Sequence, residues 1–368
     1  VGYTAGNSVT TGTDNTLIGG LSGDAITDGN TNTAVGSYSL TTNQRGDRNT
    51  AIGFESLKAM NPSGDVDTYN TAVGYQSGLA VTTGVQNTLI GAEAGDAITD
   101  DHDTTAVGYQ ALTAATVGGN TAVGSESLQN NTTGNSNVAM GLQAGRFVTT
   151  ADGSTFIGVN AGKGITGAKL TGDDNTAVGK NAGLNLQGAA TNNTLLGASA
   201  GDTITTGVNN IIIGYVSDVS AADASTQFVL GHGVTSVGNG NFTFGDGTTD
   251  SNIAHGATSI TAPSDQRYKE DIATATAGLS FIKDLRPVTF KWKKEKDLPT
   301  SHRAYVDGSE SRTINDYTNH GFVAQEVKTA IDAHSEIKDG FDMWSTDDQA
   351  DGGRQRIGDA SLMPMMVK

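Results

Sequence analysis

A five-residue motif recurs along the first two thirds of the chain and largely decides what this part can fold into. It first reads Asn15-Thr-Leu-Ile-Gly19, and its next two copies end at Gly36 and Gly53. Further copies end at Gly74, Gly91, Gly108, Gly124, Gly141, Gly158, Gly179, Gly197, Gly214, Gly231 and Gly245. Most steps between these glycines are 17 residues, two are 21 and the last is 14. A fixed period of this length indicates stacked coils, each one a supersecondary unit.

Each coil has room for one short strand between turns rich in Gly, Asn and Thr, and none is long enough for a helix. The residue before each repeat glycine is apolar, as in Ile18, Val35 and Met140. Because side chains alternate along a strand, this column faces one side. The pattern predicts that it is the core column of a β-solenoid.

The column one residue earlier points the other way and is also mostly apolar, as in Leu17, Ala34 and Phe156. A strand that is apolar on both faces is usually buried on both faces. A thin coil cannot bury both by itself. We therefore expect the second surface to come from other chains, which predicts an oligomer.

Asparagines and glycines form two further columns that indicate architecture rather than binding sites. Asparagine tolerates turn geometry, and its amide can bond to the next coil in a ladder. Glycine allows positive φ or a close approach of two backbones. The asparagine column contains Asn15, Asn32, Asn49, Asn70, Asn87, Asn120, Asn137, Asn175, Asn193 and Asn210.

Over residues 1–245 the repeat resembles the head of trimeric bacterial adhesins. That resemblance implies a parallel β-roll, with three rolls packed side by side. The period is longer here than in that family, so we expect longer outer turns. Two insertions, Asn61–Asp65 and Gly164–Asp174, are interpreted as tolerated decoration more readily than as recognition loops.

The composition changes abruptly at Ser264. Of the 50 glycines, 43 precede this residue, whereas both tryptophans follow it. Before it there are 7 basic and 21 acidic residues, a charge of −14; after it there are 15 and 18, a charge of −3. The sequence therefore predicts a repeat region over 1–245, a neck over 246–263 and a second domain over 264–368.

The second domain has an α+β pattern. Leu279, Ile282 and Leu285 fall on one helical face, and Pro287 is expected to end that helix. The alternation over residues 288–292 predicts a strand, and residues 322–333 predict a second amphipathic helix. Residues 297–318 are polar and irregular, which favours a long loop, and Gly352-Gly353 marks a turn.

Four runs in this domain resemble the intramolecular chaperone of phage tail spikes and fibres, the S74 peptidase family. They are Ser264-Asp265-x-Arg267-x-Lys269, Leu285-Arg286-Pro287-Val288-x-Phe290-x-Trp292, His320-Gly321-Phe322-Val323-Ala324-Gln325-Glu326-Val327 and Leu362-Met363-Pro364-Met365-Met366-Val367-Lys368. The resemblance implies that the domain trimerises, aligns the folding chains and then cuts itself off before the serine. The family continues into a coiled coil that is absent from this sequence.

By this resemblance Ser264 is the nucleophile, Lys269 is its base, and the bond cut is Pro263–Ser264. A desolvated lysine can activate a serine, and Ser–Lys pairs are an attested variant of the catalytic triad. His320 stands where the family has a histidine, either to orient the site or only to pack beside Gly321. Asp265 is expected to fix the turn. The chain would then be a self-cleaving serine peptidase acting once, in cis.

The charge balance and composition argue against several other classes. The acidic excess disfavours binding to nucleic acid or to an anionic membrane. The chain has no cysteine, so it forms no disulfide or thiolate metal site. No apolar run approaches membrane-spanning length. The acidic turn at residues 100–103 does not match a calcium loop, so we expect no metal and no cofactor.

These features together predict a homotrimeric phage tail fibre or virion appendage for host attachment. Its partners would be other phage tail proteins and a host-surface receptor, and it would be assembled in the host cytoplasm. The alternative is a bacterial surface trimeric adhesin, which the repeat alone also fits. An ice-binding face is disfavoured, because the Thr column (Thr16, Thr33, Thr50) provides one Thr per coil on the predicted core side. Since Gly2 is already in phase with the repeat, we expect the natural protein to extend further N-terminally.

Overall fold

The computed structural model describes residues 1–257, 260–261, 266–272, 274, 278–300, 304–338, 341, 343–346 and 355–358. The chain divides into two compact units, Val1–Ser264 and Asp265–Lys368. Each unit is described here by itself. Among the described residues, none of the helices has the length and apolar character needed to cross a membrane.

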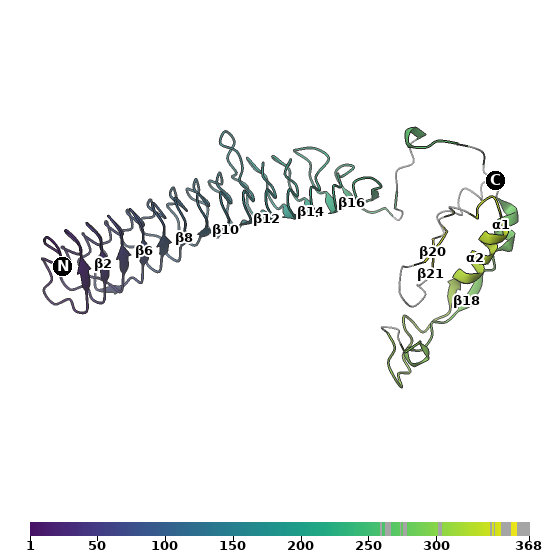
Figure 1. Ribbon diagram of the computed structural model, residues 1–368, viewed down its shortest axis with the longest axis horizontal. Coiled ribbons are helices and arrows are strands. Elements are labelled where there is room, and N and C mark those ends of the chain that lie inside the picture. Colours follow the sequence, from purple (N-terminus) through teal and green to yellow (C-terminus); the bar gives the residue numbers. More distant parts are fainter. Residues whose placement is uncertain are drawn as a thin grey trace. The chain divides into compact units, whose positions relative to one another are not determined.

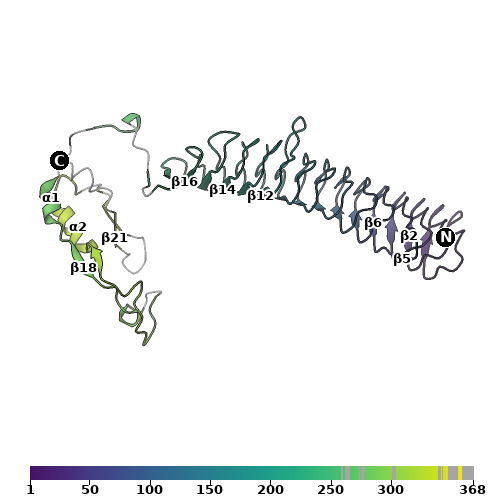
Figure 2. The same cartoon turned by 180° about the vertical axis from the view of Figure 1, so that it is seen from behind.

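The first unit is a parallel β-solenoid, as the period predicted. Fourteen strands stack in parallel, one from each coil, and β17 (Ser251–Ala254) closes the sheet in antiparallel fashion. Figures 1 and 2 show these strands along one side of the stacked coils. The parallel strands are β1 (Thr16–Ile18), β2 (Thr33–Val35), β4 (Thr50–Ile52), β6 (Thr71–Val73), β7 (Thr88–Ile90), β8 (Thr105–Val107), β9 (Thr121–Val123), β10 (Val138–Met140), β11 (Thr155–Ile157), β12 (Thr176–Val178), β13 (Thr194–Leu196), β14 (Ile211–Ile213), β15 (Phe228–Gly231) and β16 (Asn241–Gly245).

The predicted inside and outside of the strands are reversed. The residue before the glycine faces outward: Ile18 is 45% exposed, Met140 44% and Leu196 48%. The middle strand residue, such as Ala139 or Phe156, is fully buried. Alternation places the two columns on opposite faces but does not say which face is inside. The outer turns send Leu and Ile side chains into a narrow interior, which leaves room mainly for alanine at the strand.

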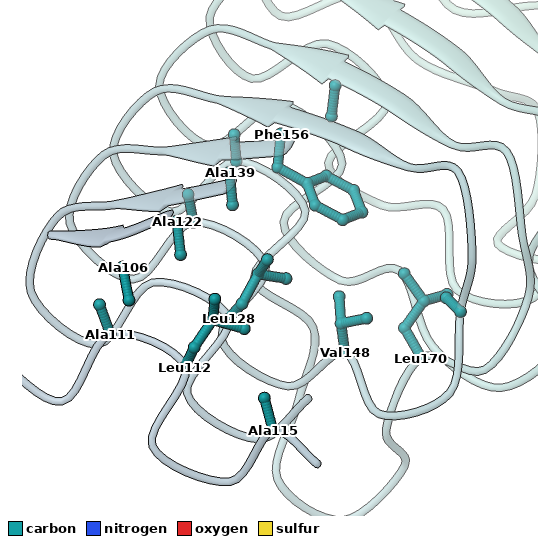
Figure 3. Close-up of a cluster of buried hydrophobic side chains, with 14 of the residues drawn as sticks. Ala106, Ala111, Leu112, Ala115, Ala122, Leu128, Ala139, Val148, Phe156 and Leu170 are labelled. Carbon is teal, nitrogen blue, oxygen red and sulfur yellow. The ribbon is translucent and has the colours of Figure 1, made fainter. Parts of the chain in front are cut away.

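Figure 3 shows how this interior is filled. Ala106, Ala122 and Ala139 project from neighbouring strands toward side chains of the turns, which include Leu112 and Leu128. Where Phe156 replaces alanine on the strand, the turn residue of the same coil is Gly162, and a Cβ there would overlap the Phe156 ring. Large side chains on one wall therefore meet small ones on the other, as close packing requires.

The asparagine and glycine columns have the structural roles that the sequence predicted. The backbone N–H of Asn49 donates to Oδ1 of Asn32 (3.0 Å), and that of Asn87 donates to Oδ1 of Asn70 in the same way (3.0 Å). The repeat glycines from Gly19 to Gly231 have φ between 130° and 147°. In Gly91, for example, a Cβ would strike the carbonyl group of Gly108 in the next coil. Only glycine fits at this point of each coil.

The two insertions differ in how they join the solenoid. In the insertion at 164–174, Leu170 is fully buried and forms a bridge with Val148, so its second half supplies core. The insertion at 61–65 leads into β5 (Val66–Asp67), which pairs with β3 (Gly46–Asp47) on a separate small sheet. The insertion at 164–174 is therefore partly structural rather than only a tolerated surface loop.

The second unit contains two α-helices, two short 3-10 helices and four short strands among its described residues. They are η1 (Gln266–Tyr268), α1 (Leu279–Asp284), β18 (Val288–Phe290), η2 (Glu295–Asp297), β19 (Asn319–Gly321), α2 (Ala324–Ala333), β20 (Trp344–Thr346) and β21 (Gln355–Ile357). β18 pairs with β19 and β20 with β21, both antiparallel. The turn predicted at Gly352-Gly353 lies outside the described residues.

Both predicted helices are present, but the buried face of the first was only partly predicted. Leu279 is 61% exposed, whereas Phe281 is fully buried. Phe281 packs with Val327, Ala330, Ile331 and Met343, and Ile282 and Leu285 lie at the edge of this core. The segment predicted as a long loop folds back on residues 293–295, which lie just after β18. The Glu295 N–H donates to the carbonyl of Ser311 (2.9 Å), and that of Thr313 to the carbonyl of Lys293 (3.1 Å).

Candidate functional site

The structure describes two of the residues predicted for self-cleavage. Pro263, Ser264 and Asp265 lie outside the described residues. Lys269 directly follows η1, its backbone N–H donates to the carbonyl of Gln266 (3.1 Å), and the residue is exposed in this single chain. The Ser264–Lys269 pair therefore stays a prediction.

His320 occupies the middle of β19, opposite Thr289 of β18. Its neighbours in register are Val288 with Gly321 and Phe290 with Asn319. The residue is exposed, so its side chain is not a core element of the unit. Both roles considered for His320, orienting the cleavage site and packing beside Gly321, stay predictions.

An ion pair joins two of the four sequence motifs. Arg286, from the Leu-Arg-Pro-Val run, donates from Nε to Oε2 of Glu326 in α2 (2.9 Å), and its second guanidinium nitrogen contacts Oε1. This fork is the bidentate geometry that arginine and carboxylate favour. The hydrogen bonds from Arg286 lower the pKa of Glu326. Because β18 and β19 also pair, the motifs around residues 285–292 and 320–327 form one structural unit.

His334 connects the ends of the two helices. Its Nε2 lies 2.8 Å from Oδ2 of Asp284 at the end of α1, and its Nδ1 lies 3.3 Å from Oε1 of Glu336. The hydrogen bond with Asp284 raises the pKa of His334, burial opposes this effect, and Glu336 adds to the rise. Sequence reasoning found no partner for this histidine, since Asp284 is 50 residues away.

The outward face of the solenoid sheet has a composition unlike the rest of the chain. The first residue of each strand faces outward and is mainly threonine, while the third also faces outward and is mainly aliphatic. At β15 and β16 these outward residues are Phe and Leu. None of the outward residues of the fourteen parallel strands is charged. Monomeric soluble proteins rarely expose a continuous apolar surface of this length, and such surfaces usually mark a contact with a partner. At about 4.8 Å per strand, the strip is about 60 Å long.

Comparison with known proteins identifies the start of the second unit. Residues 264–335 match the family described as Chaperone of endosialidase, Peptidase_S74. No curated protein and no solved structure matches the chain. The matched segment starts at Ser264, includes Lys269 and His320, and ends just after α2.

Fold and match together define the class of protein. The chain combines a repetitive parallel β-solenoid with a chaperone domain that follows it in sequence. More particularly, it carries an S74-type chaperone-of-endosialidase domain, as its motifs predicted. This combination fits a protein of the phage tail fibre or tail spike type.

Proposed function

We propose that this protein is a homotrimeric tail fibre or virion appendage that attaches a phage to its host. The observation that carries the proposal is the S74-type domain placed directly after the solenoid. Such a particle would sit on the virion, with other tail proteins at one end and a host-surface receptor as its target. The S74 match favours this function over a bacterial surface adhesin.

The uncharged strip supports association of three chains. Each chain exposes its Thr and aliphatic columns to water, as in Ile52, Ile90 and Ile157, each 38% exposed. Burying these columns against other copies would remove a long apolar surface from water, at about 25 cal/mol for each Å². Charged residues are depleted in the centres of stable interfaces, as they are on this strip.

A chaperone domain solves a registry problem in such an assembly. Neighbouring coils are nearly alike, so chains paired one coil out of step lose few contacts. Parallel pairing between chains also folds slowly and exposes strand edges meanwhile. A globular domain that trimerises first would fix the register and raise the effective concentration of the chains.

We further propose that the domain cuts the Pro263–Ser264 bond after assembly. The Oγ of Ser264 attacks the Pro263 carbonyl carbon while Lys269 takes the hydroxyl proton. The C–N bond between Pro263 and Ser264 breaks as Lys269 passes this proton to the Ser264 nitrogen, which leaves an ester and a free amine. Water then hydrolyses the ester. A lysine base needs desolvation. Since Lys269 is exposed in the single chain, neighbouring copies would have to cover it, which ties cleavage to completed assembly.

One preparation tests both parts of the proposal. The full-length protein is measured by light scattering and by denaturing mass spectrometry. We expect three chains per particle and a new N-terminus at Ser264, with Ser264→Ala and Lys269→Ala leaving the chain whole. A monomeric particle would contradict the trimer, and cutting at this bond in both variants would contradict the dyad. Glu270→Gln, at an exposed residue beside Lys269 with no assigned role, is the matched control and should still be cut.

A further inference from the structure

An exposed row of aromatic rings follows the repeat glycines of the N-terminal coils. Its members are Tyr38, Phe54, Tyr75 and Tyr109, which are 37%, 41%, 49% and 49% exposed. Phe54 stacks on Tyr75 with centroids 5.6 Å apart and planes 11° apart, and Tyr38 meets Phe54 edge-on at 6.1 Å. We call these four residues the aromatic row. Rings held by their neighbours bury surface on a ligand at little entropic cost.

The row has one position where a ring is missing. Phe54, Tyr75 and Tyr109 each directly follow a repeat glycine, and Ala92 occupies the same position in the coil between the two tyrosines. The coils are in register there, since the N–H of Glu93 donates to the carbonyl of Tyr75 and that of Gln110 to the carbonyl of Ala92. Two coil steps separate the tyrosines by about 10 Å. A ring inserted above Ala92 would lie about 5 Å from each, a normal stacking distance.

A row of polar side chains runs beside the rings. Gln76 Nε2 donates to Oε2 of Glu55 (2.8 Å), and Gln110 Nε2 donates to Oε2 of Glu93 (2.6 Å). All four are half-buried, and these hydrogen bonds fix their planar groups. We call Glu55, Gln76, Glu93 and Gln110 the polar row. Lys58 Nζ already donates to Oε1 of Glu55, and Gln129 Nε2 donates to Oε1 of Gln110 (2.6 Å each). The remaining lone pairs and the second N–H of each amide can bond to hydroxyl groups of either role.

The two rows match the chemistry of a sugar chain. A pyranose ring has an apolar C–H face, which suits an aromatic ring, and an edge of hydroxyl groups, which suits carboxylates and amides. The acidic groups of the polar row, and the charge of −14 on residues 1–263, disfavour a polyanionic chain. We propose that the aromatic row binds a neutral oligosaccharide, with one sugar ring in the slot between Tyr75 and Tyr109 above Ala92.

This surface is distinct from the strip assigned to contacts between copies. The strip is uncharged, whereas the aromatic row is bordered by Glu55 and Glu93, and Lys58 lies over the Tyr38 ring at 5.5 Å. Charged groups of this kind are typical of the wet rim of an interface rather than of its centre. The inference rests on the proposed host attachment, for which it supplies a ligand class, but it does not depend on the number of chains.

The test begins with the full chain on an array of neutral, sialylated and uronic-acid-containing oligosaccharides. We expect binding to a neutral member, whose Kd is then measured by calorimetry. Tyr75→Ala and Tyr109→Ala should each weaken that binding about tenfold or more, as loss of a central aromatic anchor does. Tyr215→Ala is the matched control, because Tyr215 follows a repeat glycine in a distant coil that lacks the polar row.

The slot allows a sharper variant. Ala92→Tyr would complete the ring stack, so we expect it to abolish binding while leaving the melting temperature unchanged or higher. Ala198→Tyr, at the same position of a distant coil, should leave binding intact. Three results would overturn the inference: no binding to any neutral oligosaccharide, binding only to acidic ones, or full binding by the Ala92 variant.

Light scattering of the same variants separates this inference from the proposed assembly. If Tyr75→Ala changes the number of chains per particle, the aromatic row is a contact between copies and the sugar assignment fails. If the wild-type particle is monomeric yet binds a neutral oligosaccharide through Tyr75, the proposed trimer fails and the binding site stands.

Discussion

At the scale of single residues, the solenoid interior is a series of size matches between strand and turn. Leu89 on its strand faces Gly95, where a Cβ would lie 2.7 Å from a Leu89 methyl group. Ala106 instead has Leu112 as its turn partner, and both are fully buried. The buried volume of each coil thus stays nearly constant, because a large side chain on the strand is matched by a small one on the turn, and the reverse.

Gly162 is the tightest of these positions, so we predict that Gly162→Ala destabilises the solenoid by about 2 kcal/mol or more. The added methyl would collide with the Phe156 ring, and the residue has a φ of 54°, so overpacking adds to backbone strain. Urea unfolding followed by far-UV circular dichroism measures the effect.

Gly167→Ala is the matched control for that experiment. Gly167 lies five residues after Gly162, in the insertion at 164–174, and a Cβ there would have nothing within 4 Å. We expect its unfolding midpoint to stay at the wild-type value. Equal destabilisation by the two variants would mean that the collision with Phe156 is not what limits residue 162.

At this scale the sequence predicted the roles of the asparagine and glycine columns correctly, but it assigned the wrong strand column to the core. The asparagine and glycine columns could be assigned because their roles follow from local backbone geometry. The core column could not, since Ala139 and Met140 are both apolar, and only the width of the interior decides that the smaller one goes inside. The correction also moves the Thr column to the outside, together with the aliphatic column.

At the scale of elements, α1 and α2 are held together by a small core and by polar contacts at their ends. Phe281 of α1 packs edge-on against the His334 ring at 5.5 Å, just beyond the end of α2. The same histidine reaches Asp284 at the end of α1. Charge on His334 therefore stabilises the contact between the helices.

We predict that this contact makes the second unit less stable as pH rises above neutrality. The pKa of His334 is raised in the folded chain, so its contribution is complete below about pH 6.5, the usual value in an unfolded chain. The contribution is lost as pH rises through the raised value. Trp292 and Trp344 both lie in this unit, so tryptophan fluorescence during urea unfolding reports on it alone.

His334→Gln should remove most of the fall in unfolding midpoint between pH 6 and pH 9. The control is His255→Gln, in the first unit, which should leave the fall unchanged. A midpoint that rises with pH in the wild type would show that other titrating groups outweigh this histidine.

The elements of the second unit were predicted better than their pairing. Local periodicity was enough for α1, β18 and α2, because each has a clear apolar spacing and Pro287 follows the first helix. The β18–β19 pairs join residues 29 to 33 apart, and the Arg286–Glu326 fork joins residues 40 apart. No local pattern reports contacts at such separations. Ser264 lies outside the described residues, so its catalytic role stays a prediction from the motifs.

At the scale of the whole molecule, the uncharged strip is the feature most sensitive to a single charge. Val123 lies outward near the middle of the strip, on β9. If three copies meet there, Val123→Glu would bring several carboxylates into a buried interface, at a cost of several kcal/mol each. We predict that this variant dissociates at concentrations where the wild type is trimeric, as measured by light scattering.

Thr133→Glu adds the same charge on an exposed outer turn of a neighbouring coil and is the control. It should leave the particle mass unchanged. An unchanged mass for Val123→Glu as well, down to the lowest measurable concentration, would place the contact between copies somewhere other than the sheet face.

The glycine column has a consequence for how such a chain can change in length. Every coil closes onto the next through the same backbone contact, as between Gly91 and Gly108. A gene duplication that inserts a whole coil would reproduce that joint on both sides, whereas one that inserts part of a coil would put a side chain where none fits. Proteins that descend from this chain should therefore have solenoids whose lengths differ by whole multiples of about 4.8 Å, the spacing of neighbouring strands. Recombination between repeats would change the length of the protein in fixed steps.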